Sequence, residues 1–464
     1  MFLKLEQKNK SKLAMLDSDG QQATYGEIVE FCTDFGNVVK SRTLIFVLND
    51  NSIGAAEGYL AAMSNRIVPL MLSSSMDAGL LEELINTYHP EYLWKPKTMA
   101  GEQGIIFEEK GYVLVRTELT PFTLYEDLSL LLTTSGSTGS PKLVRHSYNN
   151  LEAQARNISS FFEATEDDKP MVDLPINYTM GLSVLNSYLY AGATVLLTGL
   201  NPFSPKYWEF LKTNETTVLT NVPYYYEILR KLRFFRMDLP FLRIITQGGG
   251  KLSDDLYMEC AEYAKRTGKK FIPTYGQTEG SARMAYLPAE LSSSKCGSIG
   301  RAIPNGKLYL IDEEGTIINE PDVIGEMVYE GPNVTLGYAI KGEDLALGDE
   351  RKGVLPTGDM VRMDADGCFY IVGRKKRFLK LWGYRVGLDE CENIIKAEFD
   401  VECACVGTDE KMLIYVTTSE NLNEIKKHVS LKTNINSSAF EMRYIEKMPR
   451  NEAGKILYSK LEVE

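Results

Sequence analysis

A loop rich in small and hydroxyl-bearing residues is the part of the chain best suited to chemistry. Residues 130–142 read LLLTTSGSTGSPK, an apolar run followed by two glycines, several hydroxyl side chains and Lys142. Glycine lets backbone N–H groups turn toward an anion, and hydroxyl and lysine side chains add further donors. The pattern therefore predicts a loop that wraps phosphate groups. It is not a Walker loop, because Pro141 precedes the lysine, and the alternative reading is a flexible Ser/Gly linker.

A second motif, YGQTE at 275–279, follows the apolar residues 271–273. Tyr275 offers a flat ring on which a nucleobase can stack, Thr278 can donate a hydrogen bond to a phosphate, and the Glu279 carboxylate suits Mg²⁺. Taken alone, the motif is a weak signal, because a Tyr-Gly turn with a surface glutamate is common.

Three glycines and a short acidic turn add two further signals. Gly248, Gly249 and Gly250 follow the apolar run RIIT, where a strand-to-helix turn is the ordinary reading. In the Thr-Gly-Asp sequence at 357–359, the short carboxylate of Asp359 suits two adjacent ribose hydroxyls, although a plain hairpin turn is the alternative.

Two lysine-containing segments complete the set. Residues 373–380 read GRKKRFLK, with five basic side chains among eight residues. A charge run is usually a solvated face, but the bounding glycines and a change of sequence texture indicate a hinge between domains. The other segment, PRNEAGKI at 449–456, contains Lys455, which alone would be read as surface decoration.

Composition narrows the function classes. The 464 residues carry 51 Lys and Arg against 63 Asp and Glu, and the net charge of −12 argues against a general nucleic-acid binder. Seven scattered cysteines without CxxC spacing and only three histidines argue against a disulfide framework, a structural zinc site or a histidine-based triad. A charged N-terminus and the lack of an apolar run of roughly 20 residues predict a soluble, cytoplasmic protein without a membrane span.

The elements that must position these residues alternate between strands and helices. Apolar runs typical of buried strands lie at 43–48, 193–197, 218–220 and 243–246, and helical patterns lie at 53–63, 209–212, 224–232 and 254–265. This alternation predicts an α/β fold with mostly parallel sheets. From about residue 296, glycine and proline punctuate short strands, which predicts a β-barrel-like region. Beyond it a small α+β unit is expected, with helices at 388–399 and 422–429 and strands at 403–406 and 413–417.

The order of the motifs along the chain matters more than any one of them. In sequence, the chain carries TTSGSTGSPK, YGQTE, TGD, GRKKRFLKLWGYRV and NEAGKI, between residues 133 and 455. In this order they resemble the adenylate-forming superfamily, which contains acyl- and aryl-CoA synthetases, nonribosomal peptide adenylation domains and luciferases. The resemblance implies a large N-terminal AMP-binding domain, residues 1–374, with its β-rich subdomain at about 296–374. It also implies a small mobile C-terminal domain, residues 375–464, joined to the first at a hinge.

The resemblance further implies a role for each matching residue. The β- and γ-phosphates of ATP would be held by Thr134, Ser135, Gly136, Ser137, Thr138, Gly139 and Lys142. The adenosine would lie against Gly248, Gly249, Gly250, Tyr275, Gly276, Asp359 and Arg374, with the ribose hydroxyls on Asp359. Thr278 would contact the α-phosphate, and Glu279 would bind Mg²⁺.

The remaining implied roles concern the acyl group and the second domain. Lys455 would bridge the substrate carboxylate and the α-phosphate during adenylation. Lys376 would stand at the hinge, and Lys380 on the face that admits a thiol after adenylation. The acyl pocket would be formed by Tyr178, Thr179 and Gly181.

The implied reaction is ATP-dependent activation of a carboxylic acid to an acyl-AMP with release of pyrophosphate, followed by transfer to a thiol. That thiol would belong to CoA or to the phosphopantetheine of a carrier protein, and the sequence does not choose between them. Amino-acid-activating members usually carry an aspartate near Thr179 for the substrate amine. Its absence favours an acid without a free α-amine, although Asp173 lies nearby.

Three alternatives remain open at this point. The first is an amino-acid adenylation ligase serving a carrier protein, and the second is a catalytically inactive nucleotide-binding scaffold. The third is a phosphotransferase that uses the Gly-rich loop and releases ADP.

Overall fold

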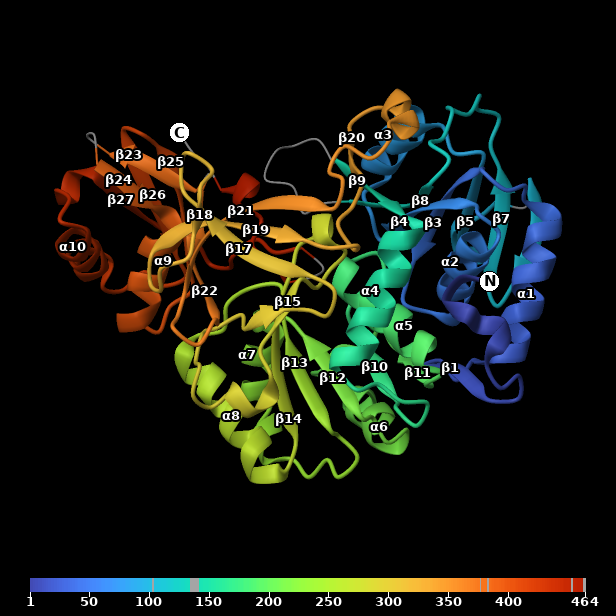
Figure 1. Cartoon of the computed structure of the whole chain (residues 1–464), viewed down its shortest axis with the longest axis horizontal. Coiled ribbons are helices and arrows are strands. Elements are labelled where there is room, and N and C mark those ends of the chain that lie inside the picture. Colours follow the sequence, from blue (N-terminus) through green and yellow to red (C-terminus); the bar gives the residue numbers. More distant parts are fainter. Residues whose placement is uncertain (102–103, 134–141, 376, 382–383, 452–453, 462–464) are drawn as a thin grey trace.

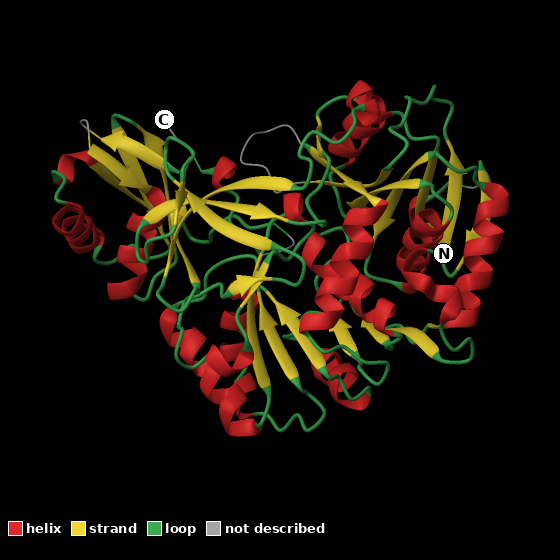
Figure 2. Ribbon diagram, in the orientation of Figure 1, coloured by secondary structure: helices red, strands yellow, loops and turns green. Residues whose placement is uncertain are grey.

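The computed structural model describes the chain except for residues 102–103, 134–141, 376, 382–383, 452–453 and 462–464. Two large sheets, a smaller antiparallel sheet and a C-terminal α+β unit make up the described part (Figure 1). Figure 2 shows helices on the outside of the sheets and, at the centre of the molecule, between them. Among the described residues, none of the helices combines the length and the apolar character that a membrane crossing requires.

The first large sheet carries the strand that leads into the predicted phosphate loop. Its order is β20 (Gly337–Ala339), β9 (Leu143–Ser147), β8 (Leu128–Thr133), β4 (Val68–Ser73), β3 (Leu44–Asn49), β5 (Tyr92–Pro96), β7 (Tyr112–Arg116) and β6 (Ile105–Glu109). Strands β8, β4, β3 and β5 are parallel, and β3 is buried along its whole length, as expected for a strand covered on both faces. The loop itself, residues 134–141, lies outside the described residues.

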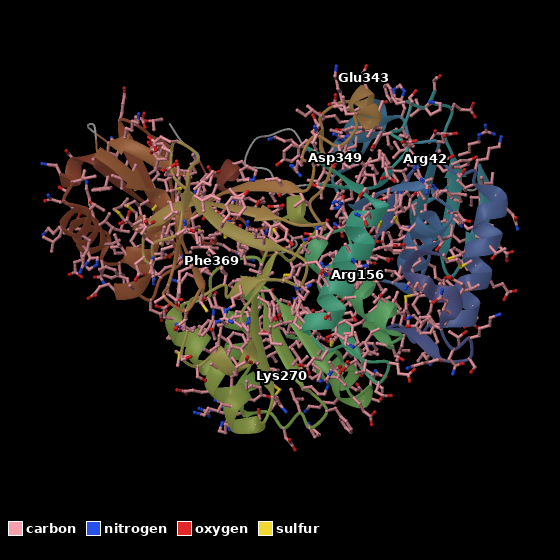
Figure 3. The ribbon with its side chains drawn as sticks, viewed as in Figure 1. Arg42, Arg156, Lys270, Glu343, Asp349 and Phe369 are labelled. Atoms are coloured by element: carbon pink, nitrogen blue, oxygen red, sulfur yellow. The ribbon has the colours of Figure 1, made fainter. Side chains whose placement is uncertain are left out.

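The second large sheet presents two of the predicted motifs at the ends of its strands. Its order is β16 (Arg301–Ala302), β15 (Ala285–Tyr286), β14 (Lys270–Tyr275), β13 (Ile244–Gln247), β12 (Val218–Asn221), β10 (Pro170–Val172), β11 (Val195–Leu197), β1 (Leu13–Asp17) and β2 (Gln22–Thr24). Strands β10 to β14 are parallel. Lys270, at the start of β14, lies toward the lower edge of the molecule in Figure 3, so the strand runs inward and Tyr275 ends it near the centre. Ligands of parallel α/β sheets bind at such carboxyl ends.

Helices of the N-terminal part separate and cover these sheets. They are α1 (Tyr25–Val38), α2 (Ile53–Ser64), α3 (Ala78–Tyr88), α4 (Tyr148–Phe161), α5 (Thr179–Ala191), α6 (Pro205–Thr213), α7 (Pro223–Lys231) and α8 (Asp254–Thr267). One hydrophobic core joins α1, α2, α4 and α5 to strands of both large sheets, and Figure 1 shows α4 and α5 between the sheets. Helix α4 begins in a capping box, in which Ser147 and Asn150 satisfy each other's backbone N–H groups.

The region after residue 296 is an antiparallel sheet followed by a unit with its own core. The sheet order is β18 (Ile317–Ile318), β17 (Lys307–Ile311), β19 (Ile324–Glu330), β21 (Val354–Met363) and β22 (Phe369–Arg374). The C-terminal unit contains β23 (Phe378–Leu381), β24 (Tyr384–Gly387), α9 (Leu388–Glu398), β25 (Cys403–Thr408), β26 (Lys411–Val416), α10 (Leu422–Thr433) and β27 (Phe440–Tyr444). Its hydrophobic cluster draws only on residues of this unit. The predicted α/β class, with a large N-terminal and a small C-terminal part, is therefore confirmed.

Candidate nucleotide and acyl site

The carboxylate of Asp359 is the centre of a buried polar network. Only 2% of this residue is exposed, and its Oδ2 atom accepts hydrogen bonds from the Tyr275 hydroxyl and from Gln277 Nε2, the latter at 2.9 Å. Its Oδ1 atom lies 2.7 Å from Arg374 Nε, because Asp359 on β21 is paired in register with Arg374 on β22. Burial raises the pKa of Asp359, although Arg374 and the two donors oppose the rise.

This network brings together three residues that the motifs placed 84 and 99 positions apart, as 359 − 275 and 374 − 275. Tyr275 was predicted to offer its ring to a nucleobase, and the structure adds that its hydroxyl orients Asp359. Gln277, the middle residue of YGQTE, was not predicted to act, and it donates to both Asp359 and the backbone carbonyl of Thr357.

A second cluster surrounds Glu279, which lies in the short 3₁₀ helix Thr278–Gly280. The Tyr338 hydroxyl, from β20, donates to Glu279 Oε1 at 2.7 Å. Two cations lie on the Tyr338 ring, with Lys142 Nζ 5.0 Å and Arg351 Cζ 4.6 Å from its centroid. Arg351 also donates to the Thr335 hydroxyl, which in turn donates to the Glu279 carbonyl at 2.9 Å. In the described part of the chain, no carboxylate forms an ion pair with either cation.

Tyr338 and Arg351 were missed by the motif reading. Tyr338 follows Gly337 in a three-residue strand that pairs with β9, directly beyond Lys142, and only this pairing brings it to the loop. Arg351 stands in the charged stretch GDERKG, which reads as a solvated turn. Burial raises the pKa of Tyr338 to about 12, with the neighbouring Glu279 adding to the rise and Arg351 opposing it.

The late lysine, Lys455, reaches the carboxyl end of β13. Its Nζ atom lies 5.2 Å from the centroid of the Tyr178 ring. Gly249 has a φ of +79°, and a β-carbon there would meet the Tyr178 hydroxyl at 2.9 Å and Lys455 Cε at 3.8 Å, so glycine leaves the space that both side chains use. A turn holds the lysine in place, since Asn451 Oδ1 accepts from the Lys455 N–H at 2.9 Å and Arg450 stacks on Tyr224, 4.3 Å from its centroid.

The predicted acyl-pocket residues lie beside this lysine. Tyr178 begins α5 and packs with an apolar cluster of Leu174, Met180 and Val222. Thr179 Oγ1 is 3.5 Å from Thr278 Oγ1, so the helix start meets the YGQTE motif. Gly181 has another place, because a β-carbon there would lie 2.4 Å from the Pro175 carbonyl oxygen, and the glycine allows α5 to approach that backbone.

Asp173, the acid noted near this region, is engaged inside the protein. Its Oδ2 atom accepts from the Tyr207 hydroxyl at 2.8 Å and from Asn221 Nδ2 at 3.2 Å. Burial raises the pKa of Asp173 to about 6, and these donors oppose the rise.

The other predicted residues divide into two groups. Gly248, Gly250 and Gly276 lie where predicted, at the ends of β13 and β14; a β-carbon at Gly276 would overlap the Ala282 carbonyl oxygen at 1.5 Å, so only glycine fits that turn. Lys380 is exposed on β23, its N–H donating to Asp409 Oδ1 at 2.8 Å, and it lies outside the clusters described above. Thr134, Ser135, Gly136, Ser137, Thr138, Gly139 and the predicted hinge residue Lys376 lie outside the described residues.

Glu279 supplies a ligand type that fits Mg²⁺. No group of three or more metal-binding side chains occurs among the residues that the structure describes. Mg²⁺ is usually held by one or two carboxylates together with substrate phosphates, so a single carboxylate beside two phosphate-binding cations is the expected donor set.

Comparisons with known proteins agree with this geometry. A family model described as AMP-binding enzyme matches residues 4–339. The oxalate–CoA ligase of Arabidopsis thaliana is 29% identical over 385 residues, which cover 82% of this chain and 73% of that protein.

Two solved structures of the o-succinylbenzoate CoA synthetase of Bacillus subtilis share the fold. One, in complex with the acyl-adenylate intermediate, has a TM-score of 0.81 and 21% identity, and the alignment covers 100% of this chain and 97% of that one. The other, in complex with ATP and a magnesium ion, has a TM-score of 0.79 and 20% identity, covering 99% and 98%.

Proposed function

Since the chain belongs to the AMP-binding enzyme family, we propose that it activates a carboxylic acid with ATP to an acyl-AMP and transfers the acyl group to CoA. The observation that carries the proposal is the position of Lys455, whose amine lies beside Tyr178 and Gly249 at the start of the acyl pocket. The Asp359 network and the Glu279 cluster stand at the neighbouring strand end.

In the proposed adenylation step, a carboxylate oxygen attacks the α-phosphorus of ATP and pyrophosphate leaves. Both reactants are anions, so positive charge must offset their repulsion. Lys455 would lie between the carboxylate and the α-phosphate, and Thr278 would donate to the α-phosphate. Lys142 and Arg351 would face the leaving pyrophosphate from the two sides of Tyr338.

The nucleotide would be oriented by the Asp359 network. The buried carboxylate is held by Tyr275, Gln277 and Arg374 before any ligand arrives, so it need not reorganise to accept the ribose hydroxyls. Glu279, positioned by Tyr338, would hold Mg²⁺ with the phosphates, and the charge of the ion would offset that of the pyrophosphate.

The second half of the reaction is assigned to the C-terminal part. We propose the domain boundary at residues 374–375, because the unit that follows has its own hydrophobic core and can move as a body. Withdrawal of Lys455 after adenylation would allow a thiol to enter, with Lys380 on the face that then turns to the site. CoA is preferred to a carrier protein because the curated relatives, such as the oxalate–CoA ligase, use CoA.

The acid is proposed to lack a free α-amine. Asp173 is the nearby carboxylate that could have paired with an ammonium group, but its Oδ2 atom already accepts from Tyr207 and Asn221. An ammonium without a partner would be costly to bury in the apolar cluster around Met180.

The test is to identify the nucleotide product formed from ATP, Mg²⁺, CoA and a panel of carboxylic acids. The proposal predicts AMP, pyrophosphate and an acyl-CoA, with acid-dependent exchange of labelled pyrophosphate into ATP. Release of ADP would indicate a phosphotransferase, and ATP binding without exchange for any acid would indicate a non-catalytic scaffold. Replacing CoA by a holo carrier protein in the same assay distinguishes the two acceptors.

A further inference from the structure

Arg283 is a buried cation without a counter-charge. It is 1% exposed, one of its terminal nitrogens donates to the Ser183 hydroxyl, and its Nε and second terminal nitrogen have no hydrogen-bond partner. Among the described residues, no carboxylate forms an ion pair with it, and its guanidinium carbon lies 5.2 Å from the centroid of the Phe162 ring. Burial lowers the pKa of Arg283 to about 10, so it still carries its charge at neutral pH.

Another buried arginine of this chain shows how a structural guanidinium is neutralised. Arg145 is equally inaccessible, but it lies 2.6 Å from Glu350 and donates to the carbonyls of Tyr338, Leu347 and Gly348. An isolated buried charge costs several kcal/mol unless a counter-ion or several acceptors satisfy it. The contrast indicates that the partner of Arg283 is a group outside the protein.

The surroundings of Arg283 offer donors rather than acceptors. The Tyr188 hydroxyl, also buried, has no hydrogen-bond partner and is near enough to Arg283 to sense its charge. Burial raises the pKa of Tyr188, so the hydroxyl remains protonated and able to donate. Two guanidinium nitrogens and one phenol without partners form a set that an oxyanion satisfies.

The position of Arg283 relates it to the acyl pocket. Thr179, which meets Thr278, and Ser183, which holds Arg283, are four residues apart on one face of α5. Four residues of helix span about 6 Å along its axis. Tyr178, which contacts Lys455, also influences the charge of Arg283. The guanidinium therefore lies about one helical turn deeper than the point where the carboxylate is activated.

We propose that the acid activated by this protein carries a second anionic group, about one helical turn from the reacting carboxylate, and that Arg283 binds it with Ser183 and Tyr188. This inference rests on the function proposed above and narrows it to short dicarboxylic acids and acids of the same charge pattern. Such an arrangement selects by charge: a monocarboxylic acid of the same length would leave the guanidinium buried and unpaired.

The test compares matched acids in pyrophosphate exchange with the full-length protein: glutarate against pentanoate, adipate against hexanoate, and isophthalate against benzoate. We expect kcat/KM for at least one dicarboxylate to exceed that of its partner by about 10- to 100-fold, the range expected for a hydrogen-bonded charge pair. Arg283→Met should abolish this ratio, Arg283→Lys should retain part of it, and Arg301→Met, at an exposed site, should leave it unchanged.

The outcomes separate this inference from the proposed function. Exchange that is equally fast for both acids of every pair, or a ratio unchanged in Arg283→Met, would overturn the role of Arg283 and leave the ligase intact. Exchange with no acid would overturn the ligase and this inference together. If Arg283→Met fails to fold, as judged by circular dichroism, the wild-type ratios alone decide the question, with Ser183→Ala as the second variant.

Discussion

Removal of the Lys455 amine is the perturbation that most directly tests the proposed adenylation. In Lys455→Ala, no positive charge would stand between the attacking carboxylate and the α-phosphate. A charge about 4 Å from the reacting oxygens, at an effective dielectric constant of about 20, contributes about 4 kcal/mol, and each 1.36 kcal/mol corresponds to a tenfold change in rate. We therefore expect adenylation to slow by about 10³-fold, in line with the loss of a single preorganised donor in other enzymes.

The fold should tolerate this substitution. In the described structure, the Lys455 backbone closes the turn with Asn451, and this interaction survives truncation of the side chain. The change in the free energy of unfolding should stay within about 0.5 kcal/mol, as for side chains without packed or paired partners.

The assay separates the two half-reactions. Adenylation is followed by pyrophosphate exchange with the best acid of the panel, and thioester formation by adding CoA to the chemically prepared acyl-AMP. Lys455→Ala should fail in the first assay and stay within about threefold of wild type in the second. Lys447→Ala, an exposed lysine on the same segment, is the matched control. An adenylation rate of Lys455→Ala within about tenfold of wild type would refute the assignment.

Three further predictions address other residues. Asp359→Asn should weaken ATP binding and remove the roughly tenfold or greater preference for ATP over 2′-deoxy-ATP expected of the wild type, as measured by calorimetry; a preference kept by the variant would contradict the ribose assignment. Arg351→Ala should raise the KM for ATP about tenfold, whereas the exposed neighbour in Lys352→Ala should not, and equal effects would show that Arg351 does not face the phosphates. Because burial raises the pKa of Asp173 to about 6, the folded state loses stability as the pH rises from about 4 through 6. Asp173→Asn should therefore raise the free energy of unfolding by ~2 kcal/mol at pH 8 and by almost nothing at pH 4, and an equal gain in urea titrations at both values would be contrary to this account.

Much of the fold follows from local patterns. The predicted helix at 254–265 is α8 (Asp254–Thr267), which has acidic residues in its first turn and Gly268 at its end. The predicted strands at 403–406 and 413–417 are β25 and β26, because short apolar runs between polar turns have few other places to go. These elements carry their boundaries in their own residues.

Elements buried on every side are harder to predict. Helix α5 reads TMGLSVLNSYLYA, and its residues from Thr179 to Leu189 are all buried. Such a segment has no polar face and so lacks the periodicity by which a surface helix is found. Its position between the two large sheets, which places Tyr178 and Ser183 at the site, is visible only in three dimensions.

The candidate site was predictable where a motif repeats a known order and unpredictable where residues meet only through pairing of distant strands. Tyr275, Asp359 and Arg374 were predicted and do meet. Tyr338 reaches Glu279 because β20 adds to the edge of the first sheet, a register that no local pattern announces. A signal for Arg283 did exist, as a lone charge in the otherwise uncharged run GSARMAYL directly after Glu279.

The unpaired guanidinium of Arg283 also bears on the life of the empty protein. If its counter-ion arrives only with the substrate, the unliganded chain is the weaker form, and occupancy adds stability by mass action. Chains that find no acid would open more often and be degraded sooner. Cellular abundance of this protein would then rise and fall with the supply of the compound it consumes, without any dedicated sensor.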